Sequence, residues 1–151
     1  MVKDDLRKEE DKAGPWAMVS KKDAAHLQIL TACACLEEGN WVSAITLAGA
    51  AEGQIKDVEH EVPDMFARIK KFEYRKRFKT EREYIAFVNR RRDWLKHNSN
   101  QKDMLFYERE AIAMVARAVF KYWLVYRDNA DEIREFANWA KDKGVGRGVI
   151  W

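Results

Sequence analysis

Long apolar runs are missing from this sequence. No segment stays apolar over the roughly 20 residues that a membrane-spanning helix needs, and the start, MVKDDLRKEEDK, is charged with no apolar run behind it. The sequence therefore predicts neither a membrane span nor a signal peptide. We expect a cytoplasmic protein without a membrane partner.

Cysteine is also scarce. Cys33 and Cys35 are the only two, and both lie in the alanine-rich segment TACACL. Residues two apart on a helix point in different directions, so a bridge between them is implausible, and two cysteines without nearby histidines make no metal cage. We interpret both as core-filling side chains, with reactive thiols as the less favoured alternative. We expect no metal and no other cofactor.

Proline and strand patterns are nearly absent. Pro15 and Pro63 are the only prolines, and no run alternates apolar and polar residues long enough to predict a strand. The pattern is typical of an all-α fold, and 151 residues with 47% hydrophobic content suit one domain. We expect a charged tail over residues 1–19, a single helical-bundle domain over 20–144 and a C-terminal tail over 145–151.

Helical periodicity and cap residues divide this domain. Ser20 and Asp23 can cap a first helix, Gly39 and Asn40 can end it, and Thr80 with Glu83 matches a capping box. The very short turn at Gly39 predicts an antiparallel hairpin of the first two helices. The expected helical segments are 26–38, 41–58, 63–78, 81–97, 107–127 and 131–144. Whether the segment 63–78 is a helix of its own or belongs with the next helix is open. The sequence predicts a bundle of four main helices and a short fifth.

One acid lies among small apolar residues. Glu52 is surrounded by AGAAEGQI, and we interpret it as a buried hydrogen-bond anchor for an arginine such as Arg117, which lies within MVARAVF. A catalytic role for Glu52 is the less favoured alternative. The small residues at 48–53 weaken the helix, which predicts close approach of a neighbouring helix.

Positive charge is concentrated in one segment. The net charge of the chain is only +3, but residues 68–97 hold twelve Lys or Arg against four Asp or Glu. Because aromatic residues are interleaved, the segment could follow a phosphate backbone and stack on unpaired bases, with Arg75 and Arg77 as candidate RNA contacts. The alternative is a solvated basic face whose aromatic residues belong to the core.

The end of this segment, NRRRDWLKHNSN at 89–100, contains the pattern R-D-x3-H formed by Arg92, Asp93 and His97. Imidazoles titrate near neutral pH, and an arginine fork matches two phosphate oxygens. Positions five apart on a helix are about 140° apart, so Arg92 and His97 act together only if the helix ends near His97 or a partner subunit contributes. Alternatively, His97 is a cation favoured by the helix dipole.

This run resembles the R-x4-6-H motif of the HEPN superfamily (higher eukaryotes and prokaryotes nucleotide-binding domain), in which a polar residue follows the arginine. The segments WVSAITLAGAAEGQI and EAIAMVARAVFKYWLV resemble a group of small uncharacterised bacterial proteins. In that group a T-L-A-x-A-A segment lies on one helix and an N-x2-R-N-x2-K-H segment on a later one. The resemblance covers roughly residues 24 to 140.

The resemblance implies a metal-independent endoribonuclease that dimerises so that two motif helices meet across a two-fold cleft. Arg92 would steady the scissile phosphate, His97 would be the general base or acid for attack by the 2′-hydroxyl, and Asp93 would orient one of them. Asn89 and Lys96 would be RNA contacts. RNA, a second copy, and an antitoxin or other protein are the implied partners.

Two alternatives to this implied site stay open. Asp93 stands where the resembling group has Asn, so it could instead form a salt bridge with Arg92 or Arg90. Many members of the superfamily are non-catalytic modules. The chain could therefore be a helical module that binds protein or nucleic acid through its basic face.

Overall fold

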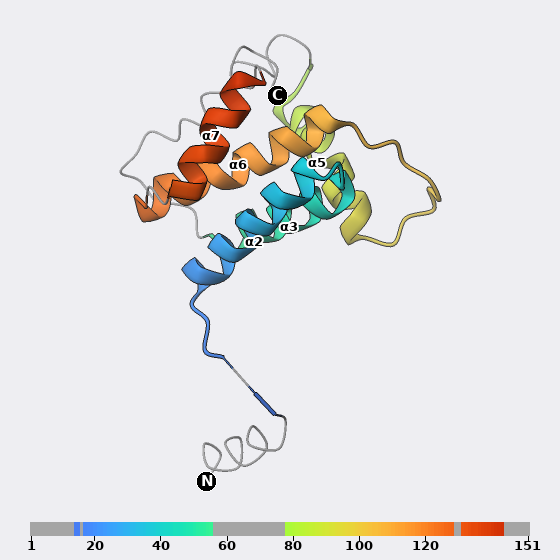
Figure 1. Ribbon diagram of the computed structural model, residues 1–151. Coiled ribbons are helices and arrows are strands. Elements are labelled where there is room, and N and C mark those ends of the chain that lie inside the picture. Colours follow the sequence, from blue (N-terminus) through green and yellow to red (C-terminus); the bar gives the residue numbers. More distant parts are fainter. Residues whose placement is uncertain (1–13, 16, 56–77, 129–130, 144–151) are drawn as a thin grey trace.

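The computed structural model describes residues 14–15, 17–55, 78–128 and 131–143. Within these ranges the chain forms five helices and no strand (Figure 1), so the all-α prediction is confirmed. None of the described helices is long and apolar enough to cross a membrane. The chain ends and residues 63–77 of the expected segment 63–78, with Arg75 and Arg77, lie outside the described residues.

Helix α2 (Lys21–Glu37) begins and ends at the residues that the cap signals predict. The Oγ atom of Ser20 accepts a hydrogen bond from the backbone N–H of Asp23 at 3.0 Å. At the other end Gly39 has a φ of +75°, and the N–H groups of Gly39 and Asn40 donate to carbonyls of the last turn. This is a Schellman motif, in which glycine is favoured because it has no Cβ.

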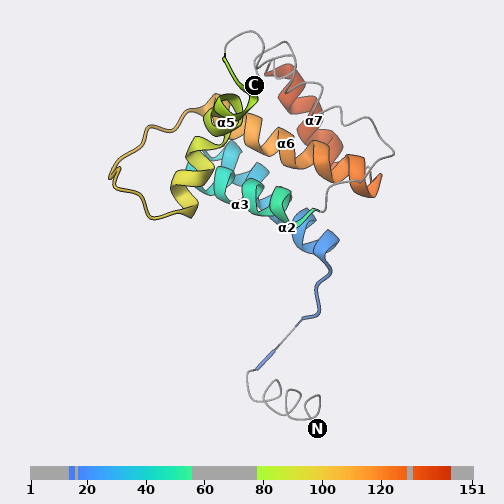
Figure 2. The ribbon, with the colours of Figure 1, turned by 180° about the vertical axis from the view of Figure 1, so that it is seen from behind.

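Helices α3 (Trp41–Gln54) and α6 (Glu108–Tyr126) complete the centre of the bundle. α2 and α3 lie side by side as the predicted hairpin, and α6 packs against both (Figures 1 and 2). The core residues of these helices are Ala25, Ile29, Ala32, Leu36, Ala44, Ile45, Ala48, Ala51, Ala111, Ile112, Met114, Val115, Ala118, Val119 and Tyr122. Alanine is the commonest of them, which allows close helix packing.

Cys33 and Cys35 are free thiols that pack, half-buried, against this core. Burial, and then the negative charge of Glu37, raise the pKa of Cys33 to about 12. A thiol with a raised pKa is a poor nucleophile, because the thiolate is the reactive form. The interpretation of Cys33 as a packing residue is thus favoured over a reactive thiol.

Helix α5 (Glu81–Lys96) packs against α3, and α7 (Asp131–Asp142) packs against α6 and α2. At the start of α5 the Oγ1 atom of Thr80 accepts a hydrogen bond from the N–H of Glu83 at 3.2 Å, which confirms the cap. The carboxylate of Glu83 accepts its reciprocal bond from the N–H of Lys79, at 3.1 Å, and not from Thr80. The box is therefore closed one residue earlier than its usual form.

The apolar stripe of α5 is only partly buried. In the sequence, the side chains that fall on one side of this helix are Tyr84, Phe87, Val88, Arg91 and Leu95, which predicts that they form a buried stripe. Tyr84 and Arg91 are buried, but Phe87 is 39% exposed, so its predicted place in the core is wrong. Phe87 lies beside Phe78, with ring centroids 5.2 Å apart. The reason is rotation: α5 turns Asn89 and Arg92, not Phe87, toward α3 and α6.

Candidate functional site

Two isolated charges meet inside the bundle. Glu52 is the one charged residue in the sequence of α3, and Arg117 is the one charged residue between positions 111 and 120 of α6. Both are buried, and the Nη2 atom of Arg117 donates to the two carboxylate oxygens of Glu52 at 2.8 and 3.0 Å. This ion pair confirms the anchor predicted for Glu52. Because buried charges are costly unless paired, each residue depends on the other.

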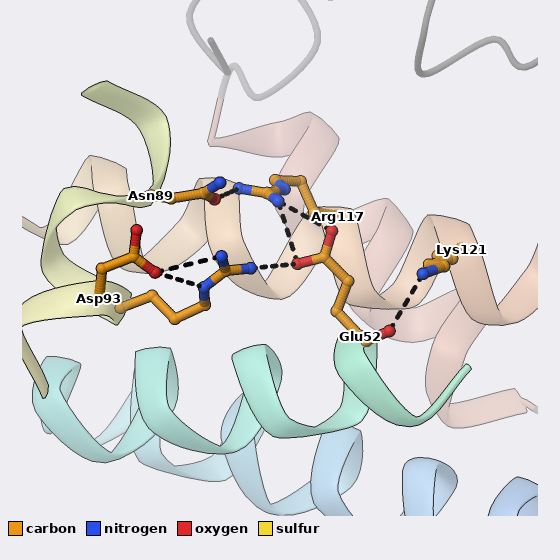
Figure 3. A network of polar contacts seen from close by, with 6 residues as sticks. Glu52, Asn89, Asp93, Arg117 and Lys121 are labelled. Carbon is orange, nitrogen blue, oxygen red and sulfur yellow. Dashed lines mark hydrogen bonds and ion pairs between the residues drawn. The ribbon is translucent and has the colours of Figure 1, made fainter. Parts of the chain in front are cut away.

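The ion pair extends to further polar groups from three helices (Figure 3). The Nη1 atom of Arg117 donates to Oδ1 of Asn89 at 2.7 Å, and Nζ of Lys121 donates to the backbone carbonyl of Glu52 at 3.1 Å. The three-helix cluster, as we name it, consists of Glu52, Asn89, Arg92, Asp93, Arg117 and Lys121. It joins α3, α5 and α6 by charge-assisted hydrogen bonds, which are stronger than neutral ones.

Arg92 is the more exposed of the two arginines in the three-helix cluster. Its Nε and Nη2 atoms donate to Oδ1 of Asp93 at 3.3 and 3.2 Å, and its Nη1 atom lies 3.5 Å from Oε2 of Glu52. Its side chain is 30% exposed, against 5% for Arg117. An anion arriving from solvent can therefore reach Arg92 more readily than Arg117. The contact with Asp93 also matches the salt bridge considered as an alternative role for that acid.

His97 lies at the end of α5. It is the C-cap residue, with an extended backbone (φ −118°, ψ 143°), and its N–H donates to the carbonyl of Asp93 at 3.0 Å. The helix thus ends where the catalytic interpretation requires. The His97 side chain is exposed, and none of the described hydrogen bonds or ion pairs of the three-helix cluster involves it. One chain brings Arg92 and Asp93 together but leaves His97 outside.

Asn89 and Lys96, the expected RNA contacts of α5, lie in different environments. Lys96 is exposed in the last turn of the helix. Asn89 is buried, and its side-chain oxygen is taken by Arg117. Asn89 therefore belongs to the interior of the bundle, because the rotation that buries Arg91 and partly buries Arg92 also carries Asn89 inward.

The two arginines before Arg92 have another partner. Nη1 of Arg91 and Nη2 of Arg90 both pair with Oε1 of Glu110 in the first turn of α6, the latter at 3.2 Å. Arg90 also lies over the ring of Phe87, 4.4 Å from its centroid. Arg90 is thus paired, although 40% of its side chain is exposed to solvent. Burial lowers the pKa of Arg91, and the neighbouring Glu110 opposes that change.

Three residues that contact these charged side chains were not identified as such from the sequence. Glu110 looked like an ordinary acid at a helix start, where the helix dipole favours one. Lys121 looked like a surface charge, and Gly49, over which the Arg92 stem packs, looked like one of several small residues. A signal was present only for Gly49, because a glycine inside a helix usually has a packing reason.

Among the described residues no group of His, Cys, Asp or Glu side chains could hold a metal ion. No protein-family model, no curated protein and no solved structure matches this chain. What the chain does has to be inferred from the chemistry of the three-helix cluster and of His97.

Proposed function

We propose that this protein is a HEPN-like, metal-independent endoribonuclease, in which Arg92 binds the scissile phosphate and His97 transfers protons. One observation carries the proposal. Arg92 is the more exposed arginine of the three-helix cluster, and it is held by the carboxylates of Glu52 on α3 and Asp93 on α5, the helix that ends at the exposed His97. The R-D-x3-H pattern and the HEPN resemblance agree with this assignment.

The Nη1 atom of Arg92 could donate a hydrogen bond to a phosphate instead of contacting Glu52. Its contact with Glu52 is 3.5 Å long, beyond the usual range for a hydrogen bond, and Oε2 of Glu52 already accepts from Arg117. A phosphate oxygen could therefore take Nη1 of Arg92 while Asp93 keeps the other contacts. Nη1 would then donate a charge-assisted hydrogen bond to one non-bridging oxygen of a phosphodiester.

His97 would supply acid–base chemistry. As base, an imidazole removes the proton of the 2′-hydroxyl, whose oxygen then attacks the adjacent phosphorus. The bond from phosphorus to the 5′-oxygen breaks, that oxygen takes a proton from water, and the imidazolium returns its proton to the solvent. The products are a 2′,3′-cyclic phosphate and a 5′-hydroxyl, so DNA, which lacks the 2′-hydroxyl, is not cut.

A second copy of the chain would complete the site. Within one chain, His97 follows the last residue of α5, and none of the described contacts of the three-helix cluster involves it. We propose a homodimer in which His97 of one copy faces Arg92 of the other. A role as a toxin or defence component, with an antitoxin or other protein partner in the cytoplasm, is consistent with such an activity.

An RNA cleavage assay with EDTA tests this proposal. Wild type should cut an RNA oligonucleotide and leave its DNA equivalent intact, and Arg92→Ala and His97→Ala should each lose at least about a hundredfold in rate. Arg134→Ala, which removes an exposed charge on α7, is the control and should keep wild-type activity. Circular dichroism checks that the variants fold. Activity that survives in His97→Ala contradicts the proposed chemistry.

The second candidate is a non-catalytic helical module. It is favoured by one observation: both carboxylates near Arg92 already neutralise it, so the three-helix cluster could serve only to join helices. In that case alanine variants of Arg92 and His97 leave RNA binding unchanged. Arg75→Glu with Arg77→Glu instead weakens binding and reduces its dependence on salt. Binding without cleavage in the assay above selects this candidate.

A further inference from the structure

Arg92 reaches the three-helix cluster by crossing α3 at a glycine. A Cβ atom placed on Gly49 would lie 2.8 Å from Cδ and 2.9 Å from Cγ of Arg92, closer than carbon atoms approach one another. Gly49 lies inside α3, where glycine weakens a helix relative to alanine. Glycine is therefore favoured at position 49 because it leaves space for the aliphatic part of the Arg92 side chain.

Gly53 provides a natural comparison on the same helix. It lies one turn after Gly49, and a Cβ placed on it would meet nothing within 4 Å. The two glycines thus share their helix and their residue type. They differ in whether Arg92 lies over them.

Glu52 contacts the other end of the Arg92 side chain. Positions 49 and 52 are three apart, so they lie on one face of α3. Gly49 lies under the aliphatic stem, and Glu52 lies 3.5 Å from the guanidinium. Glu52 is itself fixed by Arg117, which in turn donates to Asn89. A chain of polar contacts therefore leads from Asn89 and Arg117 through Glu52 to Arg92.

We propose that Gly49 and Glu52 are positioning residues for Arg92: the notch at Gly49 and the carboxylate of Glu52 hold its guanidinium at the exposed side of the three-helix cluster, where a phosphate can bind. That the bound group is a phosphate of RNA rests on the proposed function. The placement of Arg92 does not.

Gly49→Ala is the sharpest test, because its methyl group must displace something. The stem of an arginine moves more readily than a helix backbone, so α3 stays intact while the guanidinium leaves Glu52. We expect the variant to fold and melt close to wild type. Its cleavage of RNA should fall roughly a hundredfold, mainly in kcat, since a displacement of about 1 Å is enough for such a loss. Gly53→Ala should cleave RNA like wild type.

The position of Arg92 can be measured without any activity. Its Nε–Hε signal in nitrogen–proton NMR spectra is assigned by its loss in Arg92→Lys. The signal should shift or broaden in Gly49→Ala and in Glu52→Gln and stay unchanged in Gly53→Ala. An Arg92 signal that is unchanged in Gly49→Ala overturns the inference.

A double-mutant cycle of Gly49→Ala and Arg92→Ala is a second test of the inference. In the Arg92→Ala background the space over Gly49 is free, so Gly49→Ala should raise the melting temperature as Gly53→Ala does. The same effect of Gly49→Ala in both backgrounds also overturns the inference. If wild type cuts no RNA, the proposed function fails, and the NMR signal and the cycle still decide whether Gly49 and Glu52 position Arg92.

Discussion

At the scale of single residues, Glu52 has the largest role in the three-helix cluster. Its carboxylate lies between two guanidinium groups, of which Arg117 is almost completely buried. Its backbone carbonyl also accepts from Lys121. Because the carboxylate neutralises charge that solvent cannot reach, stability should depend on it more than on any exposed acid.

Glu52→Gln keeps the shape of the side chain but removes its charge. Arg92 and Arg117 then face one neutral amide, and we expect the free energy of unfolding to fall by about 3 kcal/mol. Urea denaturation measures the change. Glu37→Gln, which alters an exposed acid of α2, is the control and should change stability by less than about 0.5 kcal/mol. Equal losses in the two variants would show that Glu52 is no anchor.

At the scale of helices, polar contacts tie the start of α2 to the end of α6. Oδ2 of Asp128 lies 3.0 Å from Nζ of Lys22 and accepts a hydrogen bond from the hydroxyl of Tyr122 at 3.3 Å. The ring of His26 stacks on Tyr122, with centroids 5.7 Å apart. The hydrogen bond from Lys22 lowers the pKa of Asp128. These contacts hold the two helix ends together around the hydroxyl and ring of Tyr122, a core residue.

Tyr122 makes this junction sensitive to alkali. Burial, and then the negative charge of Asp128, raise the pKa of Tyr122 from 10.0 to about 12. The folded state thus holds the phenol proton more tightly than the unfolded state does. The contribution of the protonated Tyr122 to the free energy of unfolding is complete below pH 10 and is lost as the pH rises toward 12. Denaturation at pH 9 to 12 should show a steeper loss of stability in wild type than in Tyr122→Phe. Parallel curves would contradict the assignment.

At the scale of the whole molecule, the proposed homodimer predicts complementation between chains, because His97 of one copy would act with Arg92 of the other. Arg92→Ala and His97→Ala are each expected to be inactive. In the homodimer that we propose, the intact Arg92 of one copy would meet the intact His97 of the other. Mixing the two variants should therefore restore part of the RNA cleavage, with a dependence on protein concentration. A mixture that stays inactive would place both residues of the site in one chain.

Much of this fold could be predicted because its signals are local. Ser20, Gly39 and Thr80 form their caps within a few residues, so helix ends could be read from neighbouring sequence. The pairing of Glu52 with Arg117 was also predictable, although 65 positions separate them. Each is a lone charge in an apolar run, and a charge that must be buried requires an opposite one.

The distribution of the arginines among the acids depends instead on tertiary packing. The sequence NRRRD offers three consecutive arginines, and their spacing alone does not assign them to Glu52, Asp93 or Glu110. The rotation of α5 does so, turning Arg92 over Gly49 and leaving Arg90 and Arg91 to Glu110. That rotation also buries Asn89 and exposes Phe87. Local sequence specifies where a helix starts and ends, whereas its rotation in the bundle is set by contacts between residues far apart in the chain.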